Sequence, residues 1–268
     1  MIEITVQKAA IECLQELGYT YKEGNSLQRD LKKVVLEEDL REFLVSSYPG
    51  VPATAINEAL SAFTQHQGMD LDHRNRDFHL KMTQGVSITW KDASGKEQAR
   101  HLYPINYKEP EKNTFVCADE VKIIGKNSRR TDLLIFINGL PLIVFEFKNM
   151  FDPEVGVENA HRQIGHYFQD IPQLFDYNAI TVVSDGLETL HGMYNSSLKW
   201  FAPWKSLHGD DLQQKQELQL ETLLKGLFPK KTILNYLQNF IFHEDHNGKI
   251  IKKGAKYHQY WGIKKAVD

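Results

Sequence analysis

The sequence predicts an α/β protein in which helices flank a central β-sheet, and three observations support this fold class. Four stretches within residues 3–83 repeat apolar side chains at helical spacing. Residues 86–147 change to the alternation and turn signals of antiparallel strands. Residues 157–184 then return to a helix followed by a buried strand. This order is typical of a sheet covered by helices.

The expected helices are amphipathic, as surface helices that cover a core should be. The first, residues 3–17, ends before Gly18, which provides a plausible C-terminal stop. In order, the expected helices are residues 3–17, 33–47, 53–66, 71–83, 157–169, about 217–227 and about 232–241.

The expected strands are short and separated by turn residues. Asp92 to Gly95 are expected to join a first hairpin, and Asn138-Gly139 a second, strongly apolar one. The segment 243–268 is polar and basic, and no further element is expected there. In order, the expected strands are residues 86–91, 97–103, 114–124, two within 131–149, and 179–184.

Composition and charge favour a soluble, cytoplasmic protein with no membrane association. The chain has a formal net charge of -3, which does not indicate a basic nucleic-acid binder but does not exclude a local basic surface. Cys13 and Cys117 are the only cysteines, so neither a disulfide framework nor a zinc motif is expected. The N-terminus lacks the pattern of a signal peptide, and no apolar run is long enough to span a bilayer.

The apolar hairpin carries charged residues at its open end. Glu146 and Lys148 share one face of their strand, because side chains alternate along a strand. A plain two-residue turn would place Asp132 opposite Phe145, and therefore on the other face from Glu146. A three-residue loop or a β-bulge would place Asp132 opposite Glu146. We therefore predict that the hairpin is not joined by a plain two-residue turn.

Two interpretations of this charged end remain open from spacing alone. Two carboxylates and an ammonium could hold Mg²⁺, which activates water and neutralises charge at a phosphorus centre. A nearby lysine could orient or deprotonate the attacking water. Alternatively, Lys148 forms a buried ion pair with Asp132 or Glu146 that only closes the hairpin, although burying ions costs several kcal/mol each.

The segment RRTDLLIFINGLPLIVFEFKN resembles the PD-(D/E)xK nuclease motif. It also resembles the N-terminal endonuclease domain of the restriction (R, HsdR) subunit of type I restriction-modification enzymes. The likeness extends to NRDFHLKMTQGV, QLFDYNAITVVSDG, FAPW and YHQYWGIKKAV, and so covers nearly the whole chain. This resemblance implies a restriction-endonuclease-like core with a mixed sheet and additional N- and C-terminal helices. It also implies Mg²⁺-dependent cleavage of duplex DNA.

The resemblance assigns roles to the charged end of the hairpin. Asp132 and Glu146 would be metal ligands, with the backbone carbonyl of Phe147 as a third ligand. Lys148 would be the catalytic lysine. The chain departs from the family pattern at Thr131, where proline is usual, which puts the local backbone geometry in question.

Further residues are implied by the same resemblance. Gln163 and Tyr167, four residues apart on one helical face, match a Gln-X-X-X-Tyr motif that positions the site or contacts DNA. An early helix often supplies one more acid, for which Glu37 or Glu38 is the candidate, although acids on a solvated helix face are the commoner case.

Three basic residues precede Asp132, and they have two readings. Lys126, Arg129 and Arg130 could contact DNA phosphates beside the metal site, or they could form a solvated basic loop. The neighbouring nuclease motif favours DNA contact.

The resemblance also predicts the domain organisation and the partners. Residues 1–242 would form the endonuclease domain, and 243–268 a connector, with Gln259 exposed, into a helicase-like motor absent from this sequence. No GxxxxGK[ST] loop occurs, so ATP would serve only the full-length subunit. Partners would be duplex DNA, the methyltransferase and specificity subunits, and the motor. The alternatives are an assembly module that is inactive alone, and a repair nuclease with the same motif.

Overall fold

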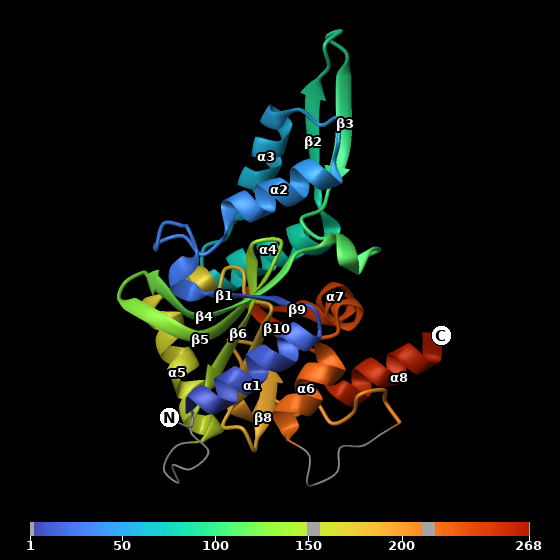
Figure 1. The fold of residues 1–268 in the computed structure, drawn as a ribbon. Helices are drawn as coiled ribbons and strands as arrows, with labels where there is room; N and C mark the ends of the chain where they lie inside the picture. The colour runs from blue at the N-terminus through green and yellow to red at the C-terminus, as the bar shows by residue number, and fades with distance from the viewer. Residues whose placement is uncertain (1–2, 149–155, 211–217, 268) are drawn as a thin grey trace.

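The computed structural model describes residues 3–148, 156–210 and 218–267 and is built around a six-stranded mixed sheet (Figure 1). The strand order is β1-β4-β5-β6-β7-β8. The β1–β4 and β6–β7 pairs are parallel, and the other neighbours are antiparallel. The strands are β1 (Thr20–Glu23), β4 (Phe115–Ile124), β5 (Ser128–Ile137), β6 (Leu140–Phe147), β7 (Ile180–Ser184) and β8 (Thr189–Gly192). The mixed sheet flanked by helices confirms the predicted fold class.

Helices α1 (Glu3–Glu16), α5 (Val157–Asp170) and α6 (Gln219–Leu227) pack against this sheet. Helix α1 contacts β1, β6 and α6, while α5 contacts β5, β6 and β7 (Figure 1). The interior strands are apolar on both faces; all eight residues of β6 are buried. Such a strand needs cover on both sides, which explains why its sequence is a continuous apolar run.

A second group of elements extends away from the sheet. It contains α2 (Glu37–Ser47), α3 (Ala53–Thr64), α4 (Leu71–Gln84) and the hairpin of β2 (Val86–Lys91) and β3 (Glu97–Leu102), which projects at the top of Figure 1. The prediction of three helices followed by a hairpin is confirmed here. Helix α2 begins four residues later than expected, because Leu36 lies outside it and donates its N–H to the Gly139 carbonyl over 2.9 Å.

The C-terminal segment contains structure that the sequence did not predict. After α7 (Lys230–Asn239), β9 (Ile241–His246) and β10 (Lys249–Gly254) form a hairpin, and α8 (Tyr257–Val267) follows. The pattern of apolar residues does not reveal these elements, because some of their buried residues are polar and form hydrogen bonds. The Lys252 side chain is only 2% exposed and donates to the Asn178 carbonyl over 2.5 Å and to Asn75 Oδ1 over 3.0 Å. Gln259 is exposed, as predicted.

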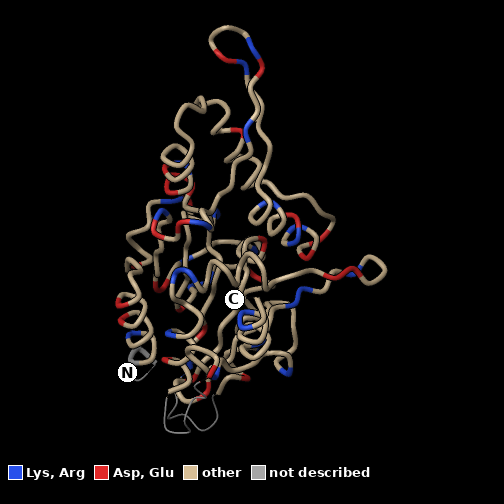
Figure 2. The backbone as a smooth tube through the Cα atoms, turned by 90° about the vertical axis from the view of Figure 1, so that its right-hand side faces the viewer, with Lys and Arg blue, Asp and Glu red and all other residues tan. Residues whose placement is uncertain are grey.

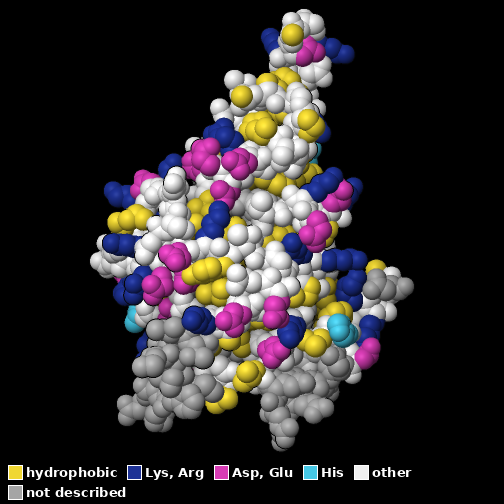
Figure 3. Space-filling view, viewed as in Figure 1, with side chains coloured by type: hydrophobic (Ala, Val, Ile, Leu, Met, Phe, Trp, Pro, Cys, Tyr) yellow, Lys and Arg dark blue, Asp and Glu magenta, His cyan; other side chains and the backbone are white. Residues whose placement is uncertain are grey.

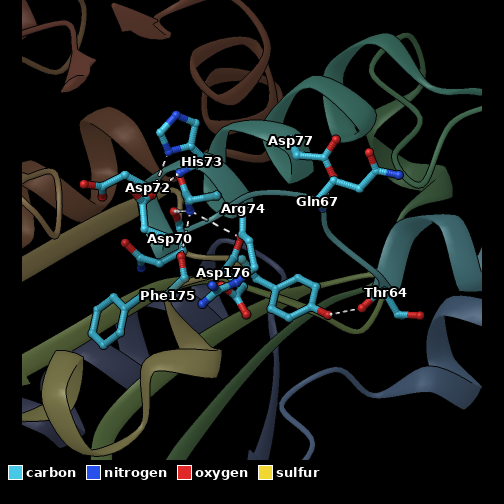
Figure 4. A network of polar contacts seen from close by, with 12 residues as sticks. Thr64, Gln67, Asp70, Asp72, His73, Arg74, Asp77, Phe175 and Asp176 are labelled. Carbon is cyan, nitrogen blue, oxygen red and sulfur yellow. Dashed lines mark hydrogen bonds and ion pairs between the residues drawn. The ribbon is translucent and has the colours of Figure 1, made fainter. Parts of the chain in front are cut away.

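The start of α4 organises the contacts between these parts. Asp70 caps the helix by accepting the His73 N–H over 3.0 Å, and Arg74 pairs with Asp176 over 2.9 Å (Figure 4). One turn further in, the Asn75 amide donates to the backbone carbonyls of Phe175 and Asn178 over 2.7 and 2.9 Å. Helix α4 therefore joins the segment before β7 to the C-terminal hairpin that also bonds to Asn75.

No helix in the described ranges is long and apolar enough to cross a membrane. Charged residues of both signs are distributed over the chain instead of gathering on one helix (Figure 2).

Candidate active site

The β5–β6 hairpin contains both a tight turn and a β-bulge. Asn138 and Gly139 form a two-residue turn with φ angles of 50° and 80°, and Ile137 pairs with Leu140 across it. Two positive φ values at the centre are typical of a type I′ turn. The turn is therefore short, but the register shifts between Ile135 and Phe136. The prediction that Asn138-Gly139 would not form a two-residue turn is therefore wrong. Of the two alternatives, an odd-length loop or a β-bulge, the structure contains the bulge.

This bulge decides which residues meet at the open end of the hairpin. Leu142 is the extra residue, because Pro141 pairs with Phe136 while Ile143 pairs with Ile135. Beyond the bulge Phe145 pairs with Leu133, so the next positions outward bring Asp132 opposite Glu146. Without the extra residue the two carboxylates would lie on different faces of the sheet.

Asp132 holds its place by bonds from two different elements. Its carboxylate oxygen Oδ2 accepts the backbone N–H of Phe147 over 2.7 Å, and this bond links the ends of β5 and β6. Its carbonyl oxygen accepts from the side-chain amide of Gln7 on α1 over 3.2 Å. These bonds fix the backbone and the carboxylate of the residue together.

Glu146 is a carboxylate buried in the apolar sheet, with 2% of its surface exposed. Burial, and next the negative charge of Asp132, raise the pKa of Glu146 to about 8. The ammonium of Lys148, 2.5 Å from Glu146 Oε1, offsets only part of this effect. The second oxygen, Oε2, is buried and accepts no hydrogen bond of ordinary geometry from the described residues, although the Tyr167 hydroxyl lies close enough to Glu146 to lower its pKa.

These properties fit a divalent cation. An ion between Asp132 and Glu146 would satisfy Oε2, and would relieve the repulsion between the two carboxylates. Among the described residues, no group of three or more His, Cys, Asp or Glu side chains is placed to hold a metal. A hard cation here would therefore complete its shell with backbone oxygen, water or phosphate, as Mg²⁺ commonly does. The carbonyl of Phe147 stays a predicted ligand.

Helix α5 brings Tyr167 and Gln163 to the same place. The Tyr167 side chain is 1% exposed and donates its hydroxyl to the Arg130 carbonyl over 2.9 Å. Burial raises the pKa of Tyr167, and the nearby carboxylates of Glu146 and Asp132 raise it further. Gln163 lies beside Tyr167 and also contacts His166 over 3.2 Å. Helix α5 thus brings Tyr167 close to the two carboxylates, while the role of Gln163 at the site stays a prediction.

The basic residues before Asp132 differ in their surroundings. Arg129 forms an ion pair with Asp170 over 2.5 Å. The Asp170 carboxylate also accepts from the Asn127 side-chain amide over 2.6 Å. The Asp170 backbone carbonyl accepts the Lys126 N–H over 2.7 Å. Arg130 is exposed and pairs weakly with Glu120 over 3.4 Å. Lys126 has an exposed side chain at the tip of the β4–β5 hairpin. Several Lys and Arg side chains lie along the left edge of Figure 3, the side on which Figure 1 shows this hairpin. The geometry therefore suits Lys126 and Arg130 for outside contacts and gives Arg129 a structural bond.

The structure does not bring Glu37 or Glu38 to this site. They begin α2 directly after Leu36, which is bonded to Gly139 at the turn of the hairpin. The carboxylates of Asp132 and Glu146 lie at the opposite, open end of the same strands. Helical amphipathicity alone could not show which end of the hairpin α2 would approach.

Sequence reasoning missed Gln7, which reaches Asp132 from a position 125 residues away. A glutamine within an amphipathic helix carries no local signal of such a contact. The only indication in the sequence is that α1 has to cover a sheet that is apolar on both faces.

Comparison with known proteins identifies the family of the chain. A family model described as "Type I restriction enzyme R protein N terminus" matches residues 3–199. The chain belongs to this family.

Similar curated proteins carry related names. The chain is 31% identical to "Type I restriction enzyme HindI endonuclease subunit" of Haemophilus influenzae, over 99% of the chain and 26% of that protein. It is also 31% identical to "Putative type I restriction enzyme MjaIXP endonuclease subunit" of Methanocaldococcus jannaschii, over 99% of the chain and 27% of that protein. The chain thus spans about a quarter of the length of these relatives.

Proposed function

We propose that this chain is the Mg²⁺-dependent endonuclease part of the restriction subunit of a type I restriction-modification enzyme, and that it hydrolyses phosphodiester bonds of duplex DNA. The observation that carries the proposal is the bulge that brings Asp132 opposite the buried Glu146, with Lys148 beside them. Membership of the R protein N-terminal family supports it. The names of the relatives as endonuclease subunits support it further.

Each residue has a role that follows from its position. Asp132 and Glu146 would hold the cation, and the Phe147 N–H keeps the Asp132 carboxylate oriented toward this edge of the sheet. Bound Mg²⁺ would lower the pKa of a coordinated water and neutralise negative charge on the phosphate. The Lys148 ammonium, at the same edge, would orient the attacking water or stabilise the charge that develops in the transition state. Tyr167 and Gln163 would support the carboxylates from α5.

The proposal extends to partners outside this chain. In the complete subunit the nuclease would act with a helicase-like motor that uses ATP, and with the methyltransferase and specificity subunits of the complex. This chain would need neither ATP nor those subunits to bind Mg²⁺, because both carboxylates come from one hairpin.

Incubation of the chain with supercoiled plasmid and Mg²⁺ tests the proposal. We expect open-circular and linear products with Mg²⁺ and none with EDTA. Absence of cleavage by the chain alone, combined with full cleavage after fusion to a motor domain, would instead favour the assembly module that is inactive in isolation.

Substitutions at the tip of the β4–β5 hairpin separate DNA contact from structural support. Lys126→Ala should leave thermal stability unchanged, but should weaken DNA binding and lower the slope of its dependence on log salt by about one. Arg129→Ala should lower the midpoint of thermal unfolding, because it removes the bond to Asp170. Binding titrations at several salt concentrations, together with thermal melts, measure both effects. Equal loss of stability in both variants would contradict the assignment.

A further inference from the structure

The regular pairing of β4 with β5 is interrupted beside Asp132. Asp119 pairs with Leu133, and Val121 pairs with Thr131, but Glu120 between them has a φ angle of 46° and forms no regular pair in this register. A positive φ at a residue other than glycine is uncommon and turns its peptide away from the strand direction. The β4–β5 ladder is therefore irregular beside Asp132.

Helix α1 supplies a restraint at this position. The Gln7 side-chain amide donates to the Asp132 carbonyl over 3.2 Å. We propose that Gln7 is a positioning residue for Asp132, and that it holds the carboxylate of Asp132 in the orientation that binds the metal. This inference rests on the proposed function.

The helix that carries Gln7 is firmly anchored. One side of α1 is buried in the core through Val6, Ala10 and Leu14, and the helix packs on α6 and β6. The Tyr19 hydroxyl, just after the helix, donates to the Phe228 carbonyl over 2.8 Å at the end of α6. A hydrogen bond from an anchored helix restricts the movement of the atom that accepts it. The bond from Gln7 therefore restricts the movement of the Asp132 carbonyl.

Two bonds on one residue explain why this restraint matters for the carboxylate. Gln7 fixes the carbonyl, and the Phe147 N–H fixes Oδ2. If the backbone of Asp132 could rotate, the bond to Phe147 would not by itself keep the carboxylate close to Glu146. Catalytic constellations tolerate displacements of only about 0.5 Å, so a small rotation should weaken metal binding. Gln7 does not touch the cation or the DNA in this account.

Gln7→Met tests the inference, because methionine has a similar length and shape but no amide donor. We expect the Mn²⁺ dissociation constant, measured by calorimetry without DNA, to rise about 3- to 10-fold, as for loss of one hydrogen bond. The Mg²⁺ concentration for half-maximal nicking should rise by a similar factor, while the KM for plasmid at saturating Mg²⁺ should not change. Gln15→Met makes the same chemical change at an exposed position of the same helix and should match the wild type.

A second variant protects the test against misfolding. Gln7→Leu also lacks a donor and, like Gln7→Met, adds no charge beside the two carboxylates, so it should weaken metal binding to a similar extent. Wild-type metal affinity in either folded variant would overturn the inference, even if thermal stability fell. Failure of the wild-type chain to bind Mn²⁺ or to nick plasmid would instead reject the proposed function itself, so the two failures are distinguishable.

Discussion

Replacement of Lys148 by alanine is expected to reduce Mg²⁺-dependent cleavage by about 10²- to 10⁴-fold, the range for loss of a positioned acid–base group. The Lys148 ammonium lies 2.5 Å from Glu146, at the edge of the sheet where the phosphate would bind. Initial rates of plasmid nicking measure the loss. The fold should survive, because the Lys148 backbone N–H still donates to the Ser184 carbonyl over 2.8 Å.

A matched control separates this effect from general loss of positive charge. Lys231→Ala removes an exposed lysine on α7 and should cut like the wild type. Circular dichroism and DNA binding of Lys148→Ala should stay close to the wild type. If Lys148→Ala unfolds instead, the ion pair with Glu146 serves mainly to close the hairpin, which is the alternative that the sequence left open.

Glu146→Gln is expected to abolish Mg²⁺-dependent cleavage and, at the same time, to stabilise the metal-free protein at high pH. The folded-state pKa of Glu146, about 8, lies above the ordinary value of 4.5. The stabilising effect of keeping this acid protonated is complete below pH 4.5, and it is lost as the pH rises through 8. Glutamine does not ionise. The free energy of unfolding of the variant should therefore increasingly exceed that of the wild type as the pH rises from 4.5 to 8. At pH 9 the difference should be on the order of a few kcal/mol.

Thermal or denaturant unfolding in EDTA at pH 5 and pH 9 measures this gain. We expect near-equal stability at pH 5 and a clear advantage for Glu146→Gln at pH 9. Glu38→Gln makes the same change on an exposed side chain of α2 and should alter neither cleavage nor the pH profile. A Glu146→Gln protein that is less stable than the wild type at pH 9 would contradict the burial argument. Loss of cleavage in Glu38→Gln would show that α2 contributes a residue to the active site.

Much of this architecture is predictable because its signals are local. Helical periodicity locates α1 to within one residue at its end, and strand alternation with turn residues locates β2 and β3. The hairpin geometry is also predictable, although not from propensity. The requirement that Asp132 and Glu146 share a face excludes an undisturbed two-residue turn, and the structure meets it with a bulge at Leu142.

The remainder depends on contacts between distant parts of the chain. Arg129 is neutralised by Asp170, 41 residues later, and Gln7 bonds to Asp132, 125 residues later. Neither pair has a spacing that a single sequence reveals. The C-terminal hairpin is concealed for a related reason. Lys252 looks like a surface lysine until Asn75 and Asn178 provide the acceptors that allow its burial.

The proposed nuclease requires Asp132 and Glu146 to bind a divalent cation together. Crystals soaked in Mn²⁺ test it directly, because anomalous scattering locates this ion independently of the protein atoms. We expect one strong anomalous peak between the two carboxylates in the wild type, and its loss in Glu146→Gln. A wild-type crystal without a peak there, at an Mn²⁺ concentration that supports plasmid nicking in solution, would contradict it.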